Sequence, residues 1–184
     1  TNTKVCHHMH IPLQSGSDKI LKLMNRKYNK KEFLAKIKEI RTCVPDINIT
    51  TDVITGFPNE TEEDFQECLD FVKEVGFTKV HTFPYSERTG TVASKMPNQV
   101  PVNIRKERAK RLIELSDTLE LAYNTDQIGK TFAVLVEEVG EDTSIGHTST
   151  YLKVVVNEKL EHNKFYNIKI TKATKDSVYG VVEA

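Results

Sequence analysis

In the first half of the chain, short runs of apolar and β-branched residues alternate with segments whose apolar residues recur at helical spacing. The short runs lie at 6–11, 47–54 and 79–83 and predict three strands. Strands that alternate with helices of this length predict parallel pairing and right-handed crossovers.

Capping signals bound the helices between these strands. Asn29 with Glu32, and Thr61 with Asp64, are spaced as the two ends of a capping box, which predicts that helices start just after Asn29 and Thr61. Gly76 predicts the end of the second helix, because glycine adopts the left-handed backbone of a helix C-terminus at little cost.

The periodicity changes in the second half of the chain. A loop at 85–101 precedes a long helix predicted at 102–127, whose first half is rich in lysine and arginine. Four further runs predict strands, at 131–139, 151–157, 165–173 and 177–182. The chain is therefore predicted to have two domains, an α/β domain over 1–128 and a small five-stranded barrel over 129–184.

Composition and charge exclude several classes of protein. The sequence has 26 Lys+Arg and 26 Asp+Glu, so net charge indicates no partner. No apolar run approaches the roughly 20 residues of a membrane span, so we expect no membrane association. Cys6, Cys43 and Cys68 lack the spacing of metal ligands or redox pairs, so we expect reduced thiols, no metal site and a cytoplasmic location.

Four segments in order carry a family resemblance. They are His10-Ile-Pro-Leu-Gln-Ser-Gly-Ser17, Leu21-Lys-Leu-Met-Asn-Arg-Lys-Tyr28, Asp52-Val-Ile-Thr-Gly-Phe-Pro-Asn-Glu-Thr61 and Phe83-Pro-Tyr-Ser-Glu-Arg-Thr-Gly-Thr91. Their order and spacing resemble the methylthiotransferase branch of the radical-SAM enzymes. The tail, with Gly129-Lys-Thr-Phe132 and Ile145-Gly-His-Thr-Ser-Thr-Tyr151, resembles the TRAM domain that closes these enzymes.

The resemblance implies a fold and a reaction. The fold class is α/β, the second half of a TIM-like parallel radical-SAM barrel, followed by a small all-β, OB-like TRAM domain. In this family a reduced iron–sulfur cluster cleaves S-adenosylmethionine, the adenosyl radical abstracts hydrogen from C2 of adenosine 37 in tRNA, and a second cluster helps deliver sulfur and methyl. The segment 80–86 resembles members that act on N6-threonylcarbamoyladenosine.

The family's two 4Fe–4S clusters are bound by a Cys-x3-Cys-x2-Cys motif and by three cysteines of an earlier domain. Cys6, Cys43 and Cys68 match none of these positions. We therefore expect part of a longer enzyme, with no catalytic residue of its own and no activity alone. The rest of the barrel would cover one strand edge, so we expect this chain to self-associate through that edge.

Candidate cofactor residues follow the first strand. Gln14, Ser15 and Gly16 lie where a strand enters a helix, the end at which barrels bind ligands. Glycine lets a ligand approach the backbone, and the helix N-terminus favours an anion. The alternative is a plain turn in which Ser17 is the helix N-cap.

The resemblance places Asp52, Ile54 and Gly56 along the adenine of the cofactor. Backbone groups of Ile54 and Gly56 would bond the purine edge, and Gly56 would leave room for it. Asp52 is polar within an apolar strand, so it faces the barrel lumen or binds neighbouring backbone. The alternative is a buried strand that ends in a glycine turn.

The histidine-rich start of the chain favours a structural reading over a metal site. His8 and His10 share one face of the predicted strand, whereas His7 points away. Two ligands are too few for structural zinc, so the pair is expected to line the lumen or to be satisfied in the core.

Candidate RNA-binding residues lie in both halves. Arg105 and Lys106 open a basic stretch that either meets tRNA phosphates or forms a solvated helix face. In the tail, His147 and Tyr151 form a candidate patch, because tyrosine stacks on bases. Residues 129–184 carry 7 Lys+Arg and 8 Asp+Glu, an unusual balance for an RNA-binding module.

The sequence therefore favours a tRNA methylthiotransferase, with tRNA as partner. Two alternatives stay open: a methylthiotransferase that modifies a ribosomal protein, and a non-catalytic RNA-binding protein whose α/β part is scaffold.

Overall fold

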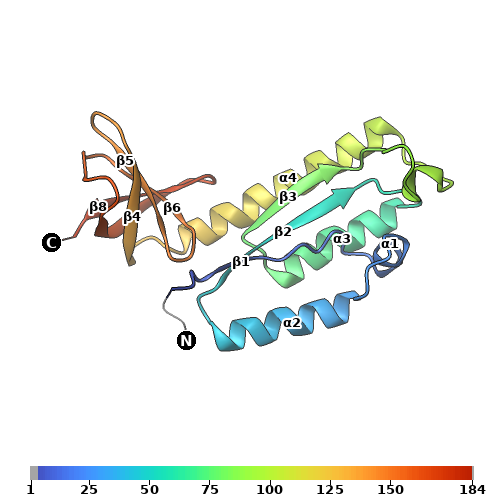
Figure 1. Ribbon diagram of the computed structural model, residues 1–184, viewed down its shortest axis with the longest axis horizontal. Helices are drawn as coiled ribbons and strands as arrows, with labels where there is room; N and C mark the ends of the chain where they lie inside the picture. The colour runs from blue at the N-terminus through green and yellow to red at the C-terminus, as the bar shows by residue number, and fades with distance from the viewer. Residues whose placement is uncertain (1–3, 184) are drawn as a thin grey trace. The chain divides into compact units, whose positions relative to one another are not determined.

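The computed structural model describes residues 4–183, which divide into two compact units (Figure 1). One unit, the α/β unit, contains residues 9–45 and 49–116. The other, the barrel unit, contains residues 4–8, 46–48 and 117–183.

The α/β unit is built on a three-stranded sheet in the order β1 (His8–His10), β2 (Asn48–Thr55), β3 (Lys79–Pro84). β2 and β3 pair in parallel, and Gln14 continues the alignment beyond β1 through a parallel bridge to Val53. The predicted parallel arrangement is confirmed for these strands.

The predicted capping signals set the helix starts. Asn29 begins α2 (Lys30–Cys43) and Thr61 begins α3 (Glu62–Val75), each with both hydrogen bonds of a capping box. Gly76 ends α3 in the left-handed conformation, with φ of 67°. The remaining helices of the unit are α1 (Asp18–Leu23), the single turn η1 (Ala93–Lys95) and the first part of α4 (Val102–Thr125).

Ser17 precedes α1 as predicted, but its hydroxyl does not cap the helix. It donates a hydrogen bond to Oδ1 of Asp64 at 3.1 Å, inside the unit. Lys19 Nζ lies 2.5 Å from the other oxygen of the same carboxylate. The side chain therefore joins α1 to the start of α3.

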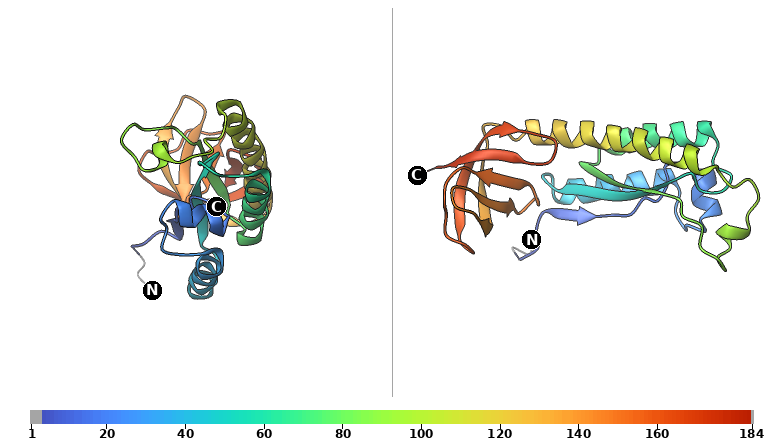
Figure 2. Two further views of the ribbon diagram at one scale, coloured as in Figure 1. Left: turned by 90° about the vertical axis from the view of Figure 1, so that its right-hand side faces the viewer. Right: turned by 90° about the horizontal axis from the view of Figure 1, so that it is seen from above.

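The two faces of the sheet differ in chemistry. Helices cover one face of the sheet (Figure 2). Leu13, Val53 and Val80 are buried in the core of the unit. On the opposite face, the side chains of His10 and His81 and the ring of Phe83 are exposed.

Five strands close into a barrel in the order β4-β5-β6-β8-β7. They are β4 (Thr131–Val139), β5 (Ser144–Thr148), β6 (Lys153–Val156), β7 (Phe165–Ala173) and β8 (Val178–Val182). β6 pairs with β8 in parallel, and the other pairs are antiparallel. The predicted runs correspond to four of these strands, whereas β5 was not predicted as a separate strand.

Valine and isoleucine side chains fill the barrel, with Val154, Ile168 and Val178 fully buried. Tyr123 of α4 packs against this core, and the side-chain amide of Asn124 donates to the carbonyl of Thr174 at 2.8 Å. The last turns of α4 therefore pack on the barrel, and residues from 117 onward belong to the barrel unit.

The described part of the chain contains no helix with the length and apolarity of a membrane span.

Close packing at Gly16 supports a stability prediction. A Cβ atom at Gly16 would lie 2.7 Å from the Cα of Cys68, on the backbone of α3. Gly16→Ala is therefore expected to lower the free energy of unfolding by about 1–3 kcal/mol, as overpacking does. Urea denaturation followed by circular dichroism measures this.

Gly140→Ala is the matched control, because the nearest atom to its new Cβ is the movable hydroxyl of Thr143 at 3.0 Å. It is expected to change stability by less than about 0.5 kcal/mol. Equal stabilities of the two variants would contradict the close approach of Gly16 to α3.

Candidate functional site

A cavity of about 490 Å³ lies at the carboxyl ends of the strands of the α/β unit. Its lining combines a carboxylate, a guanidinium and aromatic rings. The lining residues are Gln14, Asp52, Ile54, Phe57, Phe83, Pro84, Tyr85, Ser86, Arg88, Thr91 and Ala93. Such a mixture of apolar walls and a few polar groups is typical of small-molecule sites.

A second cavity of about 440 Å³ shares Gln14, Ile54, Phe57 and Ala93 with the first. Its other walls come from α1 and the loop after it, and from the segment around η1. These residues are Leu23, Met24, Asn25, Arg26, Val92 and Met96. The shared walls make the two cavities neighbours, and each has one arginine at its lining.

Gln14 stands between the cavities in a strained backbone conformation. Its φ is 71°, which is uncommon for a residue with a side chain. Two hydrogen bonds hold it there: its N–H donates to the carbonyl of Asp52 at 2.8 Å, and its carbonyl accepts from the N–H of Ile54 at 2.9 Å. Backbone strain that the surroundings maintain in this way clusters at functional sites.

Tyr85 brings an unsatisfied polar atom to the cavity wall. Its hydroxyl is buried and has no hydrogen-bond partner among the described residues. The ring is held by Phe57 at 5.3 Å, edge to face, and by the Arg105 guanidinium, 5.0 Å from the ring centroid. An orphaned hydroxyl on a fixed ring is a feature that a bound ligand can satisfy.

The structure thus brings together three of the six predicted cofactor residues, Gln14, Asp52 and Ile54. Ser15 and Gly16 are buried and are absent from the lining of both cavities. Gly16 is packed against α3, and its N–H donates to Sγ of Cys68 at 3.1 Å. Helix packing therefore explains the glycine at this position.

Gly56 also has an internal reason to be glycine. Its φ is +71°, and a Cβ there would lie 2.4 Å from Cγ of Arg105. The Arg105 side chain therefore occupies the position that a Gly56 side chain would need. The N–H of Gly56 already donates a hydrogen bond to Oε1 of Glu60 at 2.7 Å. The predicted contact between Gly56 and the cofactor therefore remains a prediction for the carbonyl of Gly56.

A buried ion pair fixes the loop that follows β2. Nη1 of Arg108 lies 2.8 Å from Oε1 of Glu60, and both side chains are almost fully buried. Burial raises the pKa of Glu60, whereas the Gly56 N–H and Arg108 act to lower it. The pair joins the loop after β2 to α4.

Arg105 and Lys106, both predicted to bind RNA, lie in different environments. Arg105 is 8% exposed, and its guanidinium donates to the carbonyls of Val100 at 2.6 Å and Tyr85 at 3.0 Å. Its donors are thus used inside the protein. Lys106 is exposed and remains available to a partner.

In the barrel unit, His147 and Tyr151 form part of a stack of three rings. Tyr151 is 59% exposed, with a left-handed backbone of φ 63°, and its centroid lies 4.8 Å from that of His147 and 5.1 Å from that of His8. Lys153 faces His147 across the β5–β6 pair. Nδ1 of His147 is 2.5 Å from Glu137. No pattern in the sequence indicated that His8 would complete this stack.

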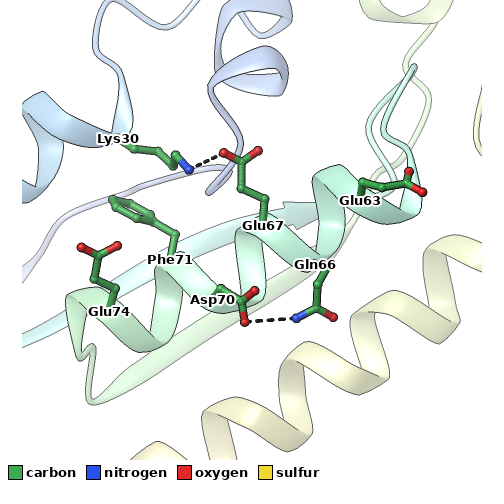
Figure 3. A pocket seen from close by; sticks show the side chains of 7 residues that line it. All are labelled: Lys30, Glu63, Gln66, Glu67, Asp70, Phe71 and Glu74. Atoms are coloured by element: carbon green, nitrogen blue, oxygen red, sulfur yellow. Dashed lines mark hydrogen bonds and ion pairs between the residues drawn. The ribbon is translucent and has the colours of Figure 1, made fainter.

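A groove along α3 has a different chemistry (Figure 3). It has a volume of about 470 Å³ and is lined by Lys30, Glu63, Gln66, Glu67, Asp70, Phe71 and Glu74. Its one lysine pairs with Glu67, and Gln66 donates to Asp70 at 3.1 Å. Four carboxylates disfavour an anionic ligand, so this groove is a poor candidate for a phosphate or a cofactor carboxylate.

The cysteines do not fit an iron–sulfur cluster, which needs several thiolates around one centre. Burial raises the pKa of Cys68 to about 12, and Cys43 is exposed at the end of α2. Within residues 4–183, no group of three or more His, Cys, Asp or Glu side chains is arranged to hold a metal ion.

Two protein families match this chain. The family model described as the Radical SAM superfamily matches residues 2–72, and the model described as the TRAM domain matches residues 126–182.

Relatives match nearly the whole chain. It is 43% identical to a tRNA-2-methylthio-N(6)-dimethylallyladenosine synthase of Caldicellulosiruptor saccharolyticus, over 97% of the chain and 39% of that relative. It is 46% identical to a synthase of the same name from Thermoanaerobacter sp., over 96% of the chain and 38% of the relative. It is 41% identical to the threonylcarbamoyladenosine tRNA methylthiotransferase MtaB of Bacillus subtilis, over 92% of the chain and 39% of that relative. The chain thus spans about two fifths of the length of these relatives.

A solved structure supports the fold. Coproporphyrinogen III oxidase (HemN) from Escherichia coli, described as a radical SAM enzyme, matches with a TM-score of 0.53 and 16% identity, over 78% of this chain and 41% of that one. At this identity the match indicates a similar fold and carries no information about the substrate.

The contrast between Arg105 and Lys106 gives a direct test. Arg105→Met leaves two backbone carbonyls without a donor and is expected to lower the free energy of unfolding by about 2–4 kcal/mol. Lys106→Met, the same change at an exposed neighbour, is expected to cost less than about 0.5 kcal/mol. Denaturant melts measure both. Loss of tRNA affinity at unchanged stability in Arg105→Met would instead assign Arg105 to RNA binding.

Proposed function

Since the chain joins a segment of the radical SAM superfamily to a TRAM domain, we propose that it is part of an enzyme that adds a methylthio group to C2 of a modified adenosine in tRNA. The observation that carries this proposal is the cavity at the carboxyl ends of the strands, lined by Gln14, Asp52 and Ile54. The enzyme would act in the cytoplasm, on tRNA.

The cavity residues fit S-adenosylmethionine, which when bound would supply the adenosyl radical and the methyl group. Ile54 and Phe57 offer apolar walls for a purine, and Asp52 offers an acceptor for hydroxyl or amino groups. Arg88 offers a donor for the cofactor's carboxylate. The buried Tyr85 hydroxyl, which has no partner among the described residues, is a further group that the ligand would satisfy.

For the substrate, we propose N6-threonylcarbamoyladenosine at position 37 of tRNA. The segment 80–86 supports this choice through its resemblance to enzymes that act on this nucleoside. The relatives include enzymes named for dimethylallyladenosine and one named for threonylcarbamoyladenosine, at 41–46% identity. The family relationship therefore supports an N6-modified adenosine, and the choice between the two rests on this segment.

The α/β unit would be the second half of a TIM-like barrel, and the closed five-stranded barrel would be OB-like. Strands β1 and β3 are the two edges of the observed sheet, and the exposed face between them would be enclosed by the rest of the barrel. Two 4Fe–4S clusters would be bound by cysteines outside these 184 residues, so the chain alone would be inactive. The β1 edge would also let the chain self-associate.

The barrel unit would bind tRNA through the patch of His147, Tyr151 and Lys153. These residues lie on β5, the β5–β6 turn and β6. In OB folds, the second and third strands form the face that binds nucleic acid, and β5 and β6 are the second and third strands here. Lys106 of α4 would add a phosphate contact.

The test of the function uses the whole reading frame that contains this chain, expressed in a bacterium that lacks its own methylthiotransferases. Mass spectrometry of tRNA nucleosides is expected to show 2-methylthio-N6-threonylcarbamoyladenosine, whereas the 184-residue chain alone yields none. The methylthio derivative of dimethylallyladenosine alone would correct the substrate. A methylthio group on a ribosomal protein, or no product at all, would overturn the proposal.

Tyr151 allows a test of the RNA surface. Tyr151→Ala is expected to weaken binding of the chain to tRNA by about tenfold, since base–aromatic stacking contributes about 1–3 kcal/mol. Fluorescence titrations at two salt concentrations measure the affinity. The affinity of the wild type for tRNA is expected to fall at the higher salt concentration, because phosphate contacts are screened. Tyr151→Phe keeps the ring and is expected to bind as the wild type does. Unchanged affinity in Tyr151→Ala would remove this patch from the proposal.

A further inference from the structure

A chain of three polar side chains crosses the exposed face of the sheet, next to the first cavity. Nδ1 of His10 lies 3.0 Å from the hydroxyl oxygen of Thr50, and Nε2 of His10 lies 3.1 Å from Oδ2 of Asp52. Thr50 and Asp52 are alternate residues of β2, so both point to the same face. His81, the neighbour of Asp52 on β3, places its ring 5.5 Å from that of His10.

The chemistry of Asp52 indicates which ring nitrogen of His10 carries the hydrogen. A carboxylate can only accept, so the contact of 3.1 Å between Nε2 of His10 and Oδ2 of Asp52 favours the tautomer with hydrogen on Nε2. In the neutral ring Nδ1 is then an acceptor, and the Thr50 hydroxyl donates to it. The carboxylate of Asp52 thus favours this tautomer, and the Thr50 hydroxyl, which can donate or accept, is compatible with it.

Of the three side chains of Thr50, His10 and Asp52, Asp52 belongs to the cavity lining. Asp52 lines the cavity, together with Gln14 and Ile54. Of its two oxygens, Oδ2 is bound to His10, and the side chain is 27% exposed. Among residues 4–183, Oδ1 has no hydrogen-bond donor, so it is available to a ligand in the cavity.

We propose that His10 is a positioning residue, which holds the Asp52 carboxylate toward the cavity so that it accepts hydrogen bonds from the hydroxyl or amino groups of a nucleoside. The proposal rests on the proposed function for the identity of the ligand class. It extends that function to His10 and Thr50, which do not line the cavity themselves. The strained backbone of Gln14 next to Asp52 supports a ligand site at this point of the wall.

The experiment is an NMR titration of the complete chain, labelled with ¹⁵N-histidine, with S-adenosylmethionine and separately with adenosine. Before ligand is added, the ¹⁵N shifts of His10 are expected to report hydrogen on Nε2. Asp52→Asn and His10→Phe are each expected to weaken ligand affinity about tenfold. Because His10 acts through Asp52, the double variant is expected to bind no more weakly than Asp52→Asn alone.

Conservative and distant variants separate positioning from folding. His10→Gln, whose amide can still donate to Asp52, is expected to recover most of the affinity that His10→Phe loses. Asp46→Asn is the matched control, because Asp46 forms a similar pair with His7, at 2.9 Å, in the barrel unit. It is expected to leave affinity unchanged. Thermal melts of every variant check the fold.

The outcomes distinguish this inference from the function on which it rests. Adenosine binding that depends on His10 and Asp52, without binding of S-adenosylmethionine, would support the inference and overturn the proposed cofactor. Full affinity in His10→Phe, an additive double variant, hydrogen on Nδ1, or no binding of either ligand to the wild type would overturn the inference.

Discussion

Two backbone hydrogen bonds between Gln14 and β2 are the constraint on which the candidate site depends. They bring the chain after β1 alongside Asp52 and Ile54, although these residues are separated by about forty positions in the sequence. A parallel sheet makes such a meeting possible, because the carboxyl ends of its strands lie at one edge. Gln14 has a left-handed backbone where the chain leaves the sheet toward α1, and it lines both cavities.

Local signals in the sequence predicted the framework well. The capping boxes at Asn29 and Thr61 are confirmed, because a capping box is formed by residues three positions apart and needs no tertiary contact. The start of α2 and the limits of β4 and β7 also agree with the predicted ones. β5 was missed because Ser144, Gly146 and Thr148 occupy its inward positions, so the usual apolar alternation is absent.

The individual roles of site residues were harder to predict, since they depend on distant partners. Gly16 and Gly56 stood out as glycines at strand ends, but α3 and Arg105 fill the spaces beside them. Arg105 belongs to a basic run, yet two carbonyls and the ring of Tyr85 hold it inside the protein. Asp52 was expected to face the lumen or to bind backbone. Its carboxylate lies 3.1 Å from Nε2 of His10, a partner that the sequence pattern does not indicate.

The contact between Gly16 and α3 has a consequence for the whole site. The backbone of Cys68 lies against Gly16, which is two residues from Gln14, and the Cys68 thiol accepts a hydrogen bond from the Gly16 N–H. Because protein interiors are packed too densely to absorb a displacement, a shift of α3 along its axis is transmitted to Gln14 and to the cavity wall. The position of α3 therefore influences ligand affinity. Substitutions on its buried side are expected to change this affinity although they do not line the cavities.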